Sequence, residues 1–544
     1  MKTPDRIIGE ILNKRGITGE DEISEFLSDR PQKTYDPFLL YNMEAGVDLL
    51  LKEIKAGTRV CIYGDYDADG VTSVCILASA LRMLTDNFTY YIPSRFDEGY
   101  GLNIDAIKKI HAQGVGLIIT VDCGSVSYDE VEFAKRLGMK VIVTDHHSID
   151  DIKADCILIN PKQKECTYPF SELAGCGIAF KMVQAIQQRE KLPKSVVTEV
   201  LDLAAVGTVG DIVSLRDENR TIVKYGLNKI NSGQRRALKC LSDRISLKQV
   251  TSENVAYGIA PHINAAGRMK HASEAAELFM SDDDSVIRQK VETLVQLNSQ
   301  RKHLQEEAYS RCIKLITGSE KIILLRMDDI HEGIAGIAAG KIKENFGRPV
   351  ILLTKTEEGY LKGTGRSIPS VDIYRLLKNH DELFERFGGH RSACGLLMAE
   401  ENFGKLEEAL DRDMSALLED NPALFDEEIR WDVVVEPEVI TVELARALEK
   451  LEPFGQDNPR PVMMLKNVNI SNVKLMGADG IHARFTAVSA RGYRCECVLF
   501  QRAVELGSML MDSRSVDITG TVNINRWNGR ESAQFIVEEI ITCM

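Results

Sequence analysis

The sequence predicts an α/β protein: a parallel-sheet domain joined by a long helix to a second α/β domain, with a C-terminal all-β barrel. Three observations support this prediction. Short apolar segments alternate with helical segments between residues 59 and 144, which is typical of a parallel sheet covered on both faces. Residues 285–316 contain neither Gly nor Pro. Five short alternating segments follow residue 462.

The first domain begins with three expected strands, at residues 60–63, 116–121 and 140–144, and with helices expected over 71–84 and 128–138. A further apolar stretch covers residues 203–209 and ends in Gly210 and Asp211. Ligands of such sheets gather at the carboxyl ends of the strands. The residues that follow each strand are therefore the first candidates for a functional site.

Apolar side chains recur every three or four residues between Ile287 and Leu315, which predicts one long helix that bridges two domains. Beyond it, residues 321–325 and 349–353 are expected strands on either side of a helix that starts near 333–340. The barrel strands are expected at 462–470, 481–488, 493–500, 516–524 and 534–541, a pattern that fits a small closed barrel.

These elements give expected domain boundaries. They are a lead-in at 1–45, the first domain at 46–280, the connecting helix at 281–318, the second α/β domain at 319–402, an acidic linker at 403–428 and the barrel domain at 429–544.

The net charge of −14 over 544 residues argues at first against a nucleic-acid binder, which is usually basic. However, residues 403–460 carry 6 basic and 16 acidic side chains, so −10 of the total lies in one segment that we interpret as linker and solvated helix. The alternative interpretation is that this acidic segment forms a surface that binds a partner or excludes DNA. No apolar run approaches the roughly 18 residues of a membrane span. Twelve Cys without paired spacing indicate reduced thiols and a cytoplasmic protein.

Acidic residues follow each expected strand. Their convergence at one sheet edge would be repulsive without cations, and carboxylates with imidazole indicate two divalent ions, Mn²⁺ or Mg²⁺. A zinc site would need thiolates, and Cys123 is the only Cys nearby. A single Asp could instead cap a helix or a turn. A calcium loop counted from Asp65 would need Glu at its twelfth position, where the chain has Ile76. The candidate catalytic residues are Asp65, Asp67, Asp69, Asp122, Asp145, His146, His147 and Asp211.

The order Asp-x-Asp-x-Asp-Gly, Val-Asp-x-Gly, Asp-His-His and Gly-x-x-x-Asp resembles the DHH phosphoesterase superfamily. The longer segments 63–73, 93–101 and 388–395 are similar to its RecJ family of single-stranded-DNA-specific exonucleases, across about residues 50–540. The resemblance implies 5′-to-3′ hydrolysis of single-stranded DNA to nucleoside 5′-monophosphates by two metal ions, in repair and recombination.

The resemblance also implies roles at the site. His147 would contact the scissile phosphate or orient a ligand, and Asp145 would set the histidine tautomer. Asp122 would bridge the two ions, with Asp65 close by. The implied metal ligands are Asp67, Asp69, Asp122, His146 and Asp211.

Phosphate-binding candidates lie in both α/β domains. Arg95 and Arg268 are candidate phosphate clamps because guanidinium groups bind phosphate with two hydrogen bonds, although a structural salt bridge is an equal alternative for each. The second α/β domain contains glycine-rich segments, which let backbone N–H groups approach an anion. The resemblance implies that this domain is the DHH-associated substrate-binding domain. Its candidates are Arg366, Ser367, Gly388, Gly389, His390 and Arg391.

The barrel resembles an oligonucleotide-binding (OB) barrel. Its candidate base-stacking residues are Phe485, Tyr493, Phe500 and Trp527. Most aromatic side chains of a small barrel belong to its core, so we expect Trp527 alone, flanked by Arg526 and Arg530, to be exposed.

Two other functions remain open: a phosphodiesterase of the superfamily acting on oligoribonucleotides or cyclic dinucleotides, and a non-catalytic single-strand-binding replication scaffold. The barrel argues against the first, since a dinucleotide needs no tracking surface, and the complete set of acids and histidines argues against the second. The expected partners are single-stranded DNA, a single-strand-binding protein and a helicase, with no membrane, for a monomeric chain.

Overall fold

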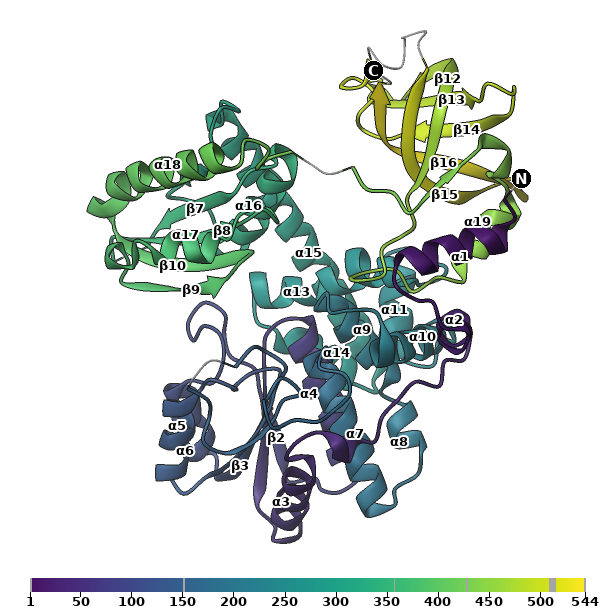
Figure 1. Ribbon diagram of the computed structural model, residues 1–544. Helices are drawn as coiled ribbons and strands as arrows, with labels where there is room; N and C mark the ends of the chain where they lie inside the picture. Colours follow the sequence, from purple (N-terminus) through teal and green to yellow (C-terminus); the bar gives the residue numbers. More distant parts are fainter. Residues whose placement is uncertain (1, 150–151, 357, 427–428, 508–514, 543–544) are drawn as a thin grey trace.

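The computed structural model describes residues 2–149, 152–356, 358–426, 429–507 and 515–542, and these residues form three sheets. Figure 1 shows the first α/β domain below, the second α/β domain above it and the barrel beside the second, with helices between them. Among the described residues, no helix is long and apolar enough to cross a membrane.

The first sheet is parallel, in the order β2-β1-β3-β4-β5. The three predicted strands are confirmed, and two short strands, β2 and β5, are added at its edges. Successive side chains of β1 face opposite sides: Val60 and Ile62 enter one core with α3, α4 and α7, whereas Cys61 and Tyr63 enter the other with α5 and α6. The strands are β1 (Arg59–Gly64), β2 (Phe88–Tyr91), β3 (Val115–Val121), β4 (Lys140–Thr144) and β5 (Ile157–Ile159), and the helices are α3 (Met43–Lys55), α4 (Ala68–Leu81), α5 (Ile104–Ala112), α6 (Tyr128–Arg136) and α7 (Gly175–Glu190).

A helical region follows the sheet. The apolar stretch 203–209 lies in helix α9, so its grouping with the strands is wrong. The stretch is buried on all sides, and such a run carries no helical periodicity by which it could be told from a buried strand. The helices are α8 (Ser195–Thr198), α9 (Leu201–Gly210), α10 (Asp217–Asn231), α11 (Arg236–Arg244), α12 (Ser252–Asn254), the π-helical turn η2 (Val255–Ile259), α13 (Ala260–Met269), α14 (Ser273–Met280) and the predicted long helix α15 (Asp284–Cys312).

The second α/β domain has the mixed sheet β6-β7-β8-β10-β9. Helix α18 (Phe403–Asp420) corrects the expected linker at 403–428: its apolar stripe, Leu406, Leu410 and Met414, packs on this domain's core, and its acidic residues cover the outer face. The remaining elements are β6 (Ile323–Arg326), α16 (Glu332–Phe346), β7 (Val350–Lys355), β8 (Tyr360–Arg366), α17 (Ile373–Lys378), β9 (Arg386–His390) and β10 (Ala393–Ala399).

The barrel contains all five predicted strands, and the pairing of β12 with β15 closes it. Phe485 and Phe535 fill its core. Its elements are β11 (Val433–Val435), α19 (Val442–Glu449), β12 (Met463–Met476), β13 (His482–Val488), β14 (Arg494–Leu499), β15 (Val516–Trp527) and β16 (Arg530–Thr542); short 3₁₀ turns elsewhere are η1 (Pro37–Leu39), η3 (Ile313–Leu315), η4 (Asp381–Leu383), η5 (Glu400–Asn402) and η6 (Pro437–Val439).

The N-terminal helices α1 (Pro4–Lys14) and α2 (Glu20–Leu27) share the hydrophobic core of the barrel, and Figure 1 shows α1 beside α19 and α2 below it, near α10. Arg220 of α10 lies below them, with its guanidinium 3.7 Å from the centre of the Phe26 ring. It donates to the carbonyl oxygens of Phe26, Leu451 and Glu452. One buried arginine therefore holds the N-terminal helices and the segment before the barrel against the helical region.

Candidate metal centre and DNA-binding cleft

The first group of acids follows β1, where the chain turns into α4. Asp67 caps this helix and accepts hydrogen bonds from the backbone N–H groups of Asp69 and Gly70, both at 3.0 Å. Asp69 is buried in the first turn and accepts from the backbone N–H groups of Gly175 (2.7 Å) and Cys176 (2.8 Å) at the start of α7. The N-termini of two helices thus stabilise one carboxylate.

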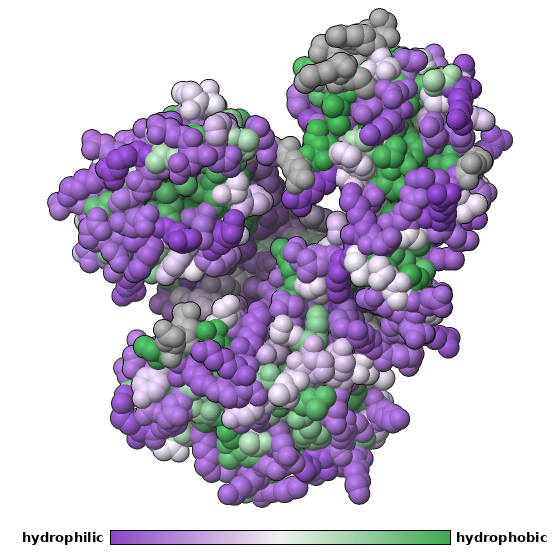
Figure 2. Space-filling view, viewed as in Figure 1, coloured by the Kyte–Doolittle hydropathy of each residue, from purple (hydrophilic) through white to green (hydrophobic). Residues whose placement is uncertain are grey.

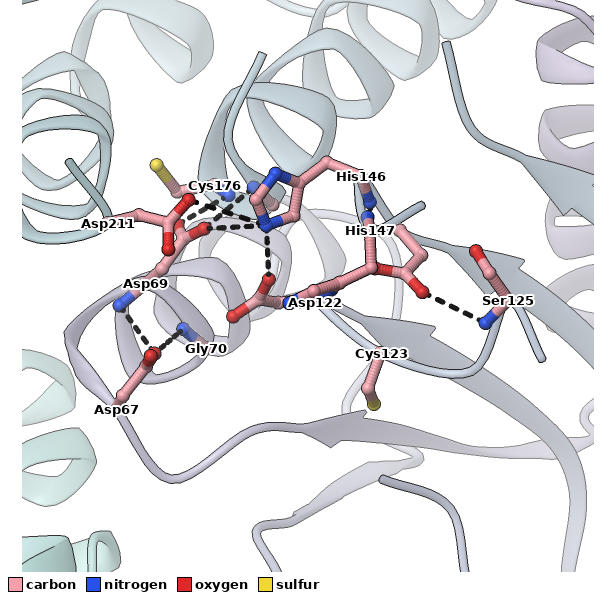
Figure 3. Close-up of polar contacts among 12 residues, drawn as sticks. Asp67, Asp69, Gly70, Asp122, Cys123, Ser125, His146, His147, Cys176 and Asp211 are labelled. Carbon is pink, nitrogen blue, oxygen red and sulfur yellow. Dashed lines mark hydrogen bonds and ion pairs between the residues drawn. The ribbon is translucent and has the colours of Figure 1, made fainter. Parts of the chain in front are cut away.

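Asp122, the residue after β3, and His146, after β4, meet Asp69 and Asp211 at the carboxyl edge of the sheet. His146 Nε2 lies 3.2 Å from Asp122 Oδ1, 3.4 Å from Asp211 Oδ2 and 3.9 Å from Asp69 Oδ2, as Figure 3 shows. Asp211 reaches the edge from the C-terminal end of α9. The predicted convergence is therefore present, although one acid comes from a helix.

The chemistry of these groups fits divalent cations. Burial, and then the neighbouring carboxylates, raise the pKa of Asp122 well above its usual range and that of Asp211 to about 8. Burial lowers the pKa of His146 to about 4, so its imidazole is neutral and able to ligate. Asp65 Oδ1, Asp122 Oδ1 and both His146 ring nitrogens are buried without a hydrogen-bond partner. These buried side chains offer many hydrogen-bond acceptors and few donors, so a bound cation would satisfy them.

Potential metal ligands form three overlapping groups, and within each group the ligand atoms lie within 4.8 Å of one another. They are Asp65 with Asp67 and Asp122, Asp69 with His146 and Asp211, and Asp122 with His146 and His147. Asp122 belongs to two of the groups, which agrees with the bridging role that the resemblance implies.

Asp145 organises the histidine pair. Its Oδ1 accepts from the backbone N–H groups of His146 (2.7 Å) and His147 (3.1 Å) and lies 2.7 Å from His147 Nδ1, while Oδ2 accepts from Ser125 N–H at 2.9 Å. Burial opposes a charge on His147, but the hydrogen bond and charge of Asp145 outweigh it and raise the pKa of His147 to about 9. His147 is thus a cation at neutral pH, beside a ligand histidine that is neutral.

Two further residues of the site carried no sequence signal of their own. Tyr100, in the segment 93–101, places its hydroxyl 3.1 Å from His147 Nδ1. Lys162 follows β5; its backbone N–H donates to Asn160 Oδ1, and Asn160 Nδ2 donates to the His147 carbonyl. The charge of Lys162 contributes, after burial and the nearer groups, to the lowered pKa of His146. Both residues lie in loops that only the fold brings to the metal centre.

Arg95, Arg268 and Arg366, here called the arginine cluster, lie together where the two α/β domains meet. Burial, and then the charge of Arg95, lower the pKa of Arg268 to about 10, and Arg366 adds to this effect. Arg268 Nη1 donates to the Gly333 carbonyl of the second domain at 3.3 Å. Among the described residues no carboxylate pairs with any of the three, so the salt-bridge alternative is not what the structure contains. Figure 2 shows a hollow in the hydrophilic surface beside this domain.

The other predicted phosphate contacts are placed differently. The Ser367 hydroxyl is buried and donates to the Val371 carbonyl, so it is directed into its own domain. Gly388, Gly389 and His390 are exposed on β9, the edge strand of the second sheet, and Arg391 donates to the Pro369 carbonyl. In Figure 1 β9 faces the first domain. The exposed residues of β9 therefore lie on the side of the second domain that faces the first, and their binding role stays a prediction.

The aromatic residues of the barrel differ in exposure. Trp527, the last residue of β15, is 72% exposed as predicted, and Phe485 is buried. The expectation that Trp527 alone is exposed is wrong, because Tyr493 (45%) and Phe500 (52%) flank β14 and lie outside the closed core. Arg526 pairs with Glu531 at 3.0 Å, which leaves Arg530 as the flanking cation without an ion pair in the described chain.

Manganese is expected to stabilise the folded protein, because the mutually repelling carboxylates bind a cation only when the fold brings them together. At 100 times the dissociation constant the stabilisation should be about 2.7 kcal/mol, measured as a rise in melting temperature. Asp122→Asn should abolish the rise. An equal rise in that variant would place the bound ion elsewhere.

Comparison with known proteins follows the same division into domains. Residues 59–208 match the model of the DHH family, N-terminal domain; residues 319–416 match the DHHA1 domain; residues 431–539 match the RecJ OB domain. The DHHA1 match continues into α18, in agreement with the packing of that helix.

Full-length relatives are similar along nearly the whole chain. The single-stranded-DNA-specific exonuclease RecJ of Escherichia coli K12 is 32% identical over 98% of this chain and 95% of its own length. That of Bacillus subtilis 168 is 34% identical over 98% and 67%. The crystal structure of RecJ in complex with Mn²⁺ from Thermus thermophilus superposes with a TM-score of 0.85 at 27% identity, covering 99% of this chain and 76% of that chain.

Proposed function

The chain belongs to the RecJ family of single-stranded-DNA-specific exonucleases, and from this premise we propose that it is a metal-dependent 5′-to-3′ exonuclease that degrades single-stranded DNA to nucleoside 5′-monophosphates. The observation that carries the proposal is the position of the arginine cluster beside the metal centre: Arg95 lies 5.0 Å from the centre of the ring of Tyr66, the residue between Asp65 and Asp67. A group of cations without carboxylate partners, next to acids that would hold metal ions, fits a terminal phosphate held one nucleotide from the bond to be broken.

The residues at the metal centre would have different roles. Asp67, Asp69, Asp122, His146 and Asp211 would hold two divalent ions, Mn²⁺ or Mg²⁺, with Asp65 beside them. Bound ions of this kind lower the pKa of a water molecule and offset negative charge on the phosphate. The charged His147, fixed by Asp145, would hold an oxygen of the scissile phosphate. The sugar 3′-oxygen of the terminal nucleotide would then leave, and the scissile phosphate would stay on the shortened strand as its new 5′ end.

A covalent protein intermediate is not part of the proposal. Cys123 and Cys176 are the thiols nearest the centre, and burial raises the pKa of both well above the ordinary value. They are therefore protonated and weak nucleophiles at neutral pH. Water is left as the attacking group.

The complete barrel favours a polymeric substrate over a cyclic dinucleotide or short oligoribonucleotide, since a small substrate needs no further binding domain. The complete set of acids favours catalysis over a scaffold role. We also propose that the protein acts in DNA repair and recombination in the cytoplasm. In this role it would be a monomer that works with a single-strand-binding protein and a helicase.

One assay tests these alternatives. The protein is incubated with Mn²⁺ and 5′-labelled single-stranded, duplex or 3′-blocked DNA, with a dinucleotide as control. We expect labelled mononucleotide from single-stranded and 3′-blocked DNA at equal rates, and little from duplex. Cleavage of the dinucleotide alone would overturn the proposal in favour of a small-substrate phosphodiesterase, and binding without turnover would favour the scaffold.

Trp527→Ala is expected to weaken single-strand binding by about 1–3 kcal/mol, the usual loss when a base-stacking aromatic is removed. Fluorescence anisotropy with a labelled oligonucleotide in EDTA would measure the change. Val504→Ala, another exposed apolar residue of the barrel domain, is the control and should leave affinity unchanged. An unaltered affinity in Trp527→Ala would show that no base stacks there.

A further inference from the structure

A groove of about 510 Å³ connects the surroundings of the metal centre with the start of the barrel domain. At one end it is lined by Gly210, which precedes Asp211, and by Asn264, whose side chain accepts from the Ala68 backbone N–H at the start of α4. At the other end it is lined by Phe454 and Arg460, in the segment that leads to β12. The groove therefore lies between residues that adjoin the proposed active site and the segment that precedes the OB barrel.

Two apolar side chains of the groove project into solvent. Tyr257 is 84% exposed and Ile212 is 70% exposed. Tyr257 comes from the π-helical turn η2, and such turns are rare and are frequently found at functional sites. An exposed tyrosine on an irregular helical turn, next to a catalytic centre, is a suitable platform for a planar ligand.

The backbone at Ile212 is strained. Its φ is 58°, in the left-handed region, where a β-branched residue is a genuine outlier. The side chain gains nothing from burial that would offset this strain, so packing does not explain why isoleucine occupies the position. Strained residues of this kind gather at ligand-binding sites, where the surrounding structure holds them in place.

The two charged side chains that line the groove are paired with each other. Arg460 forms an ion pair with Glu253 at 2.7 Å and lies over the Phe454 ring, 4.6 Å from its centre. The arginine is thus neutralised at short range and is a poor partner for phosphate. The groove offers aromatic and aliphatic surface, and the charge of its arginine is already balanced by a glutamate. Such a surface suits a nucleobase more than a backbone phosphate.

We propose that this groove holds an unpaired base of the DNA strand between the metal centre and the barrel, with the base stacked on Tyr257 and separated from its neighbour by Ile212. The inference rests on the proposed function and adds a binding subsite to it. The volume lies within the usual range for small-ligand pockets, about 300–1,000 Å³, and so suits one or two nucleotides. The groove contacts the base without reading its sequence, because every base offers a flat face.

The test combines a protein change with a DNA change. Oligonucleotides carry one abasic nucleotide, moved stepwise from the 5′ end, and KM for release of the first nucleotide is measured with Mn²⁺. In the wild-type protein, one or two abasic positions on the 3′ side of the scissile bond should raise KM about 5- to 140-fold, the range for loss of one stacked base. Tyr257→Ala should raise KM on intact DNA similarly, and should no longer respond to those positions, because both changes remove the same contact.

Two further variants sharpen the result. Tyr360→Ala removes a partly exposed tyrosine at the far end of β8, six residues and so about 20 Å from Arg366, and KM should stay at the wild-type value. Ile212→Gly relieves the positive φ, so its melting temperature should equal or exceed that of the wild-type protein while KM rises. A fall in melting temperature with unchanged KM would make Ile212 structural.

The proposed stacking would be overturned if Tyr257→Ala and the abasic nucleotide raised KM independently and additively at every position. An unchanged KM in Tyr257→Ala would overturn it as well. If the wild-type protein degrades no single-stranded DNA at all, the proposed function fails and this subsite with it. Wild-type degradation together with an unaffected Tyr257→Ala variant overturns the subsite alone.

Discussion

Asp122→Ala should lower the rate of single-stranded DNA degradation by about four orders of magnitude, the scale on which one member of a cooperating catalytic set acts. Asp122 belongs to two of the three groups of potential metal ligands, and its Oδ1 lies 3.2 Å from His146 Nε2. Its removal therefore disrupts the ligands of both proposed ions. Turnover of a 5′-labelled oligonucleotide with saturating Mn²⁺ is the measurement.

The backbone of Asp122 requires a matched variant, because its φ is 63° and alanine is strained in that region. Asp122→Asn keeps the shape and tolerates the left-handed conformation, so an equal loss in both variants assigns the effect to the carboxylate. Binding of single-stranded DNA in EDTA should remain close to wild type, since the arginine cluster and the barrel are untouched. Loss of binding together with turnover would make Asp122 a structural residue.

Asp145→Asn is expected to lower kcat about 100-fold, the upper end of the usual effect when a residue that orients a metal ligand is changed. The amide has one oxygen where the carboxylate has two, so its NH₂ group would face either the Ser125 N–H or the N–H groups of the histidine pair. His147 would also lose the negative partner that raises its pKa to about 9.

The effect of Asp145→Asn on the tautomer and charge of His147 can be measured separately from activity. In the metal-free protein, NMR titration of His147 should move from a pKa of about 9 towards the ordinary 6.5. Asp105→Asn, an exposed acid in the first turn of α5, is the control and should change neither kcat nor the titration. A variant that loses activity while His147 still titrates near 9 would contradict the role given to Asp145.

Much of the fold was predictable because its signals are local. The strands that precede Asp65, Asp122 and Asp145 are short apolar runs followed by polar residues, and the barrel strands alternate along their length. Helix α15 is an uninterrupted periodic segment. Since parallel strands share one edge, the convergence of acids and histidines followed from the same patterns.

What was missed depends on contacts between distant segments or on competing signals. Helix α9 is apolar all round and so carries no period. In α18 the stripe of Leu406, Leu410 and Met414 is present, but the many acidic residues around it favour a solvated segment, and the packing of the helix depends on a core made by distant residues. Tyr100 and Lys162 reach the centre through loops, and no spacing in the sequence encodes their positions.

The packing of α1 and α2 on the barrel has a consequence for the order of folding. Ile7 and Phe26 share a core with Phe485 and Phe535, so contacts separated by more than 400 residues complete that core. Contacts of such sequence separation form late, because a long loop must close before they become favourable. During synthesis the first sheet has all its strands early, whereas the N-terminal helices must wait for the last strands to be made. The nascent chain should therefore complete its first sheet well before the core of the barrel domain.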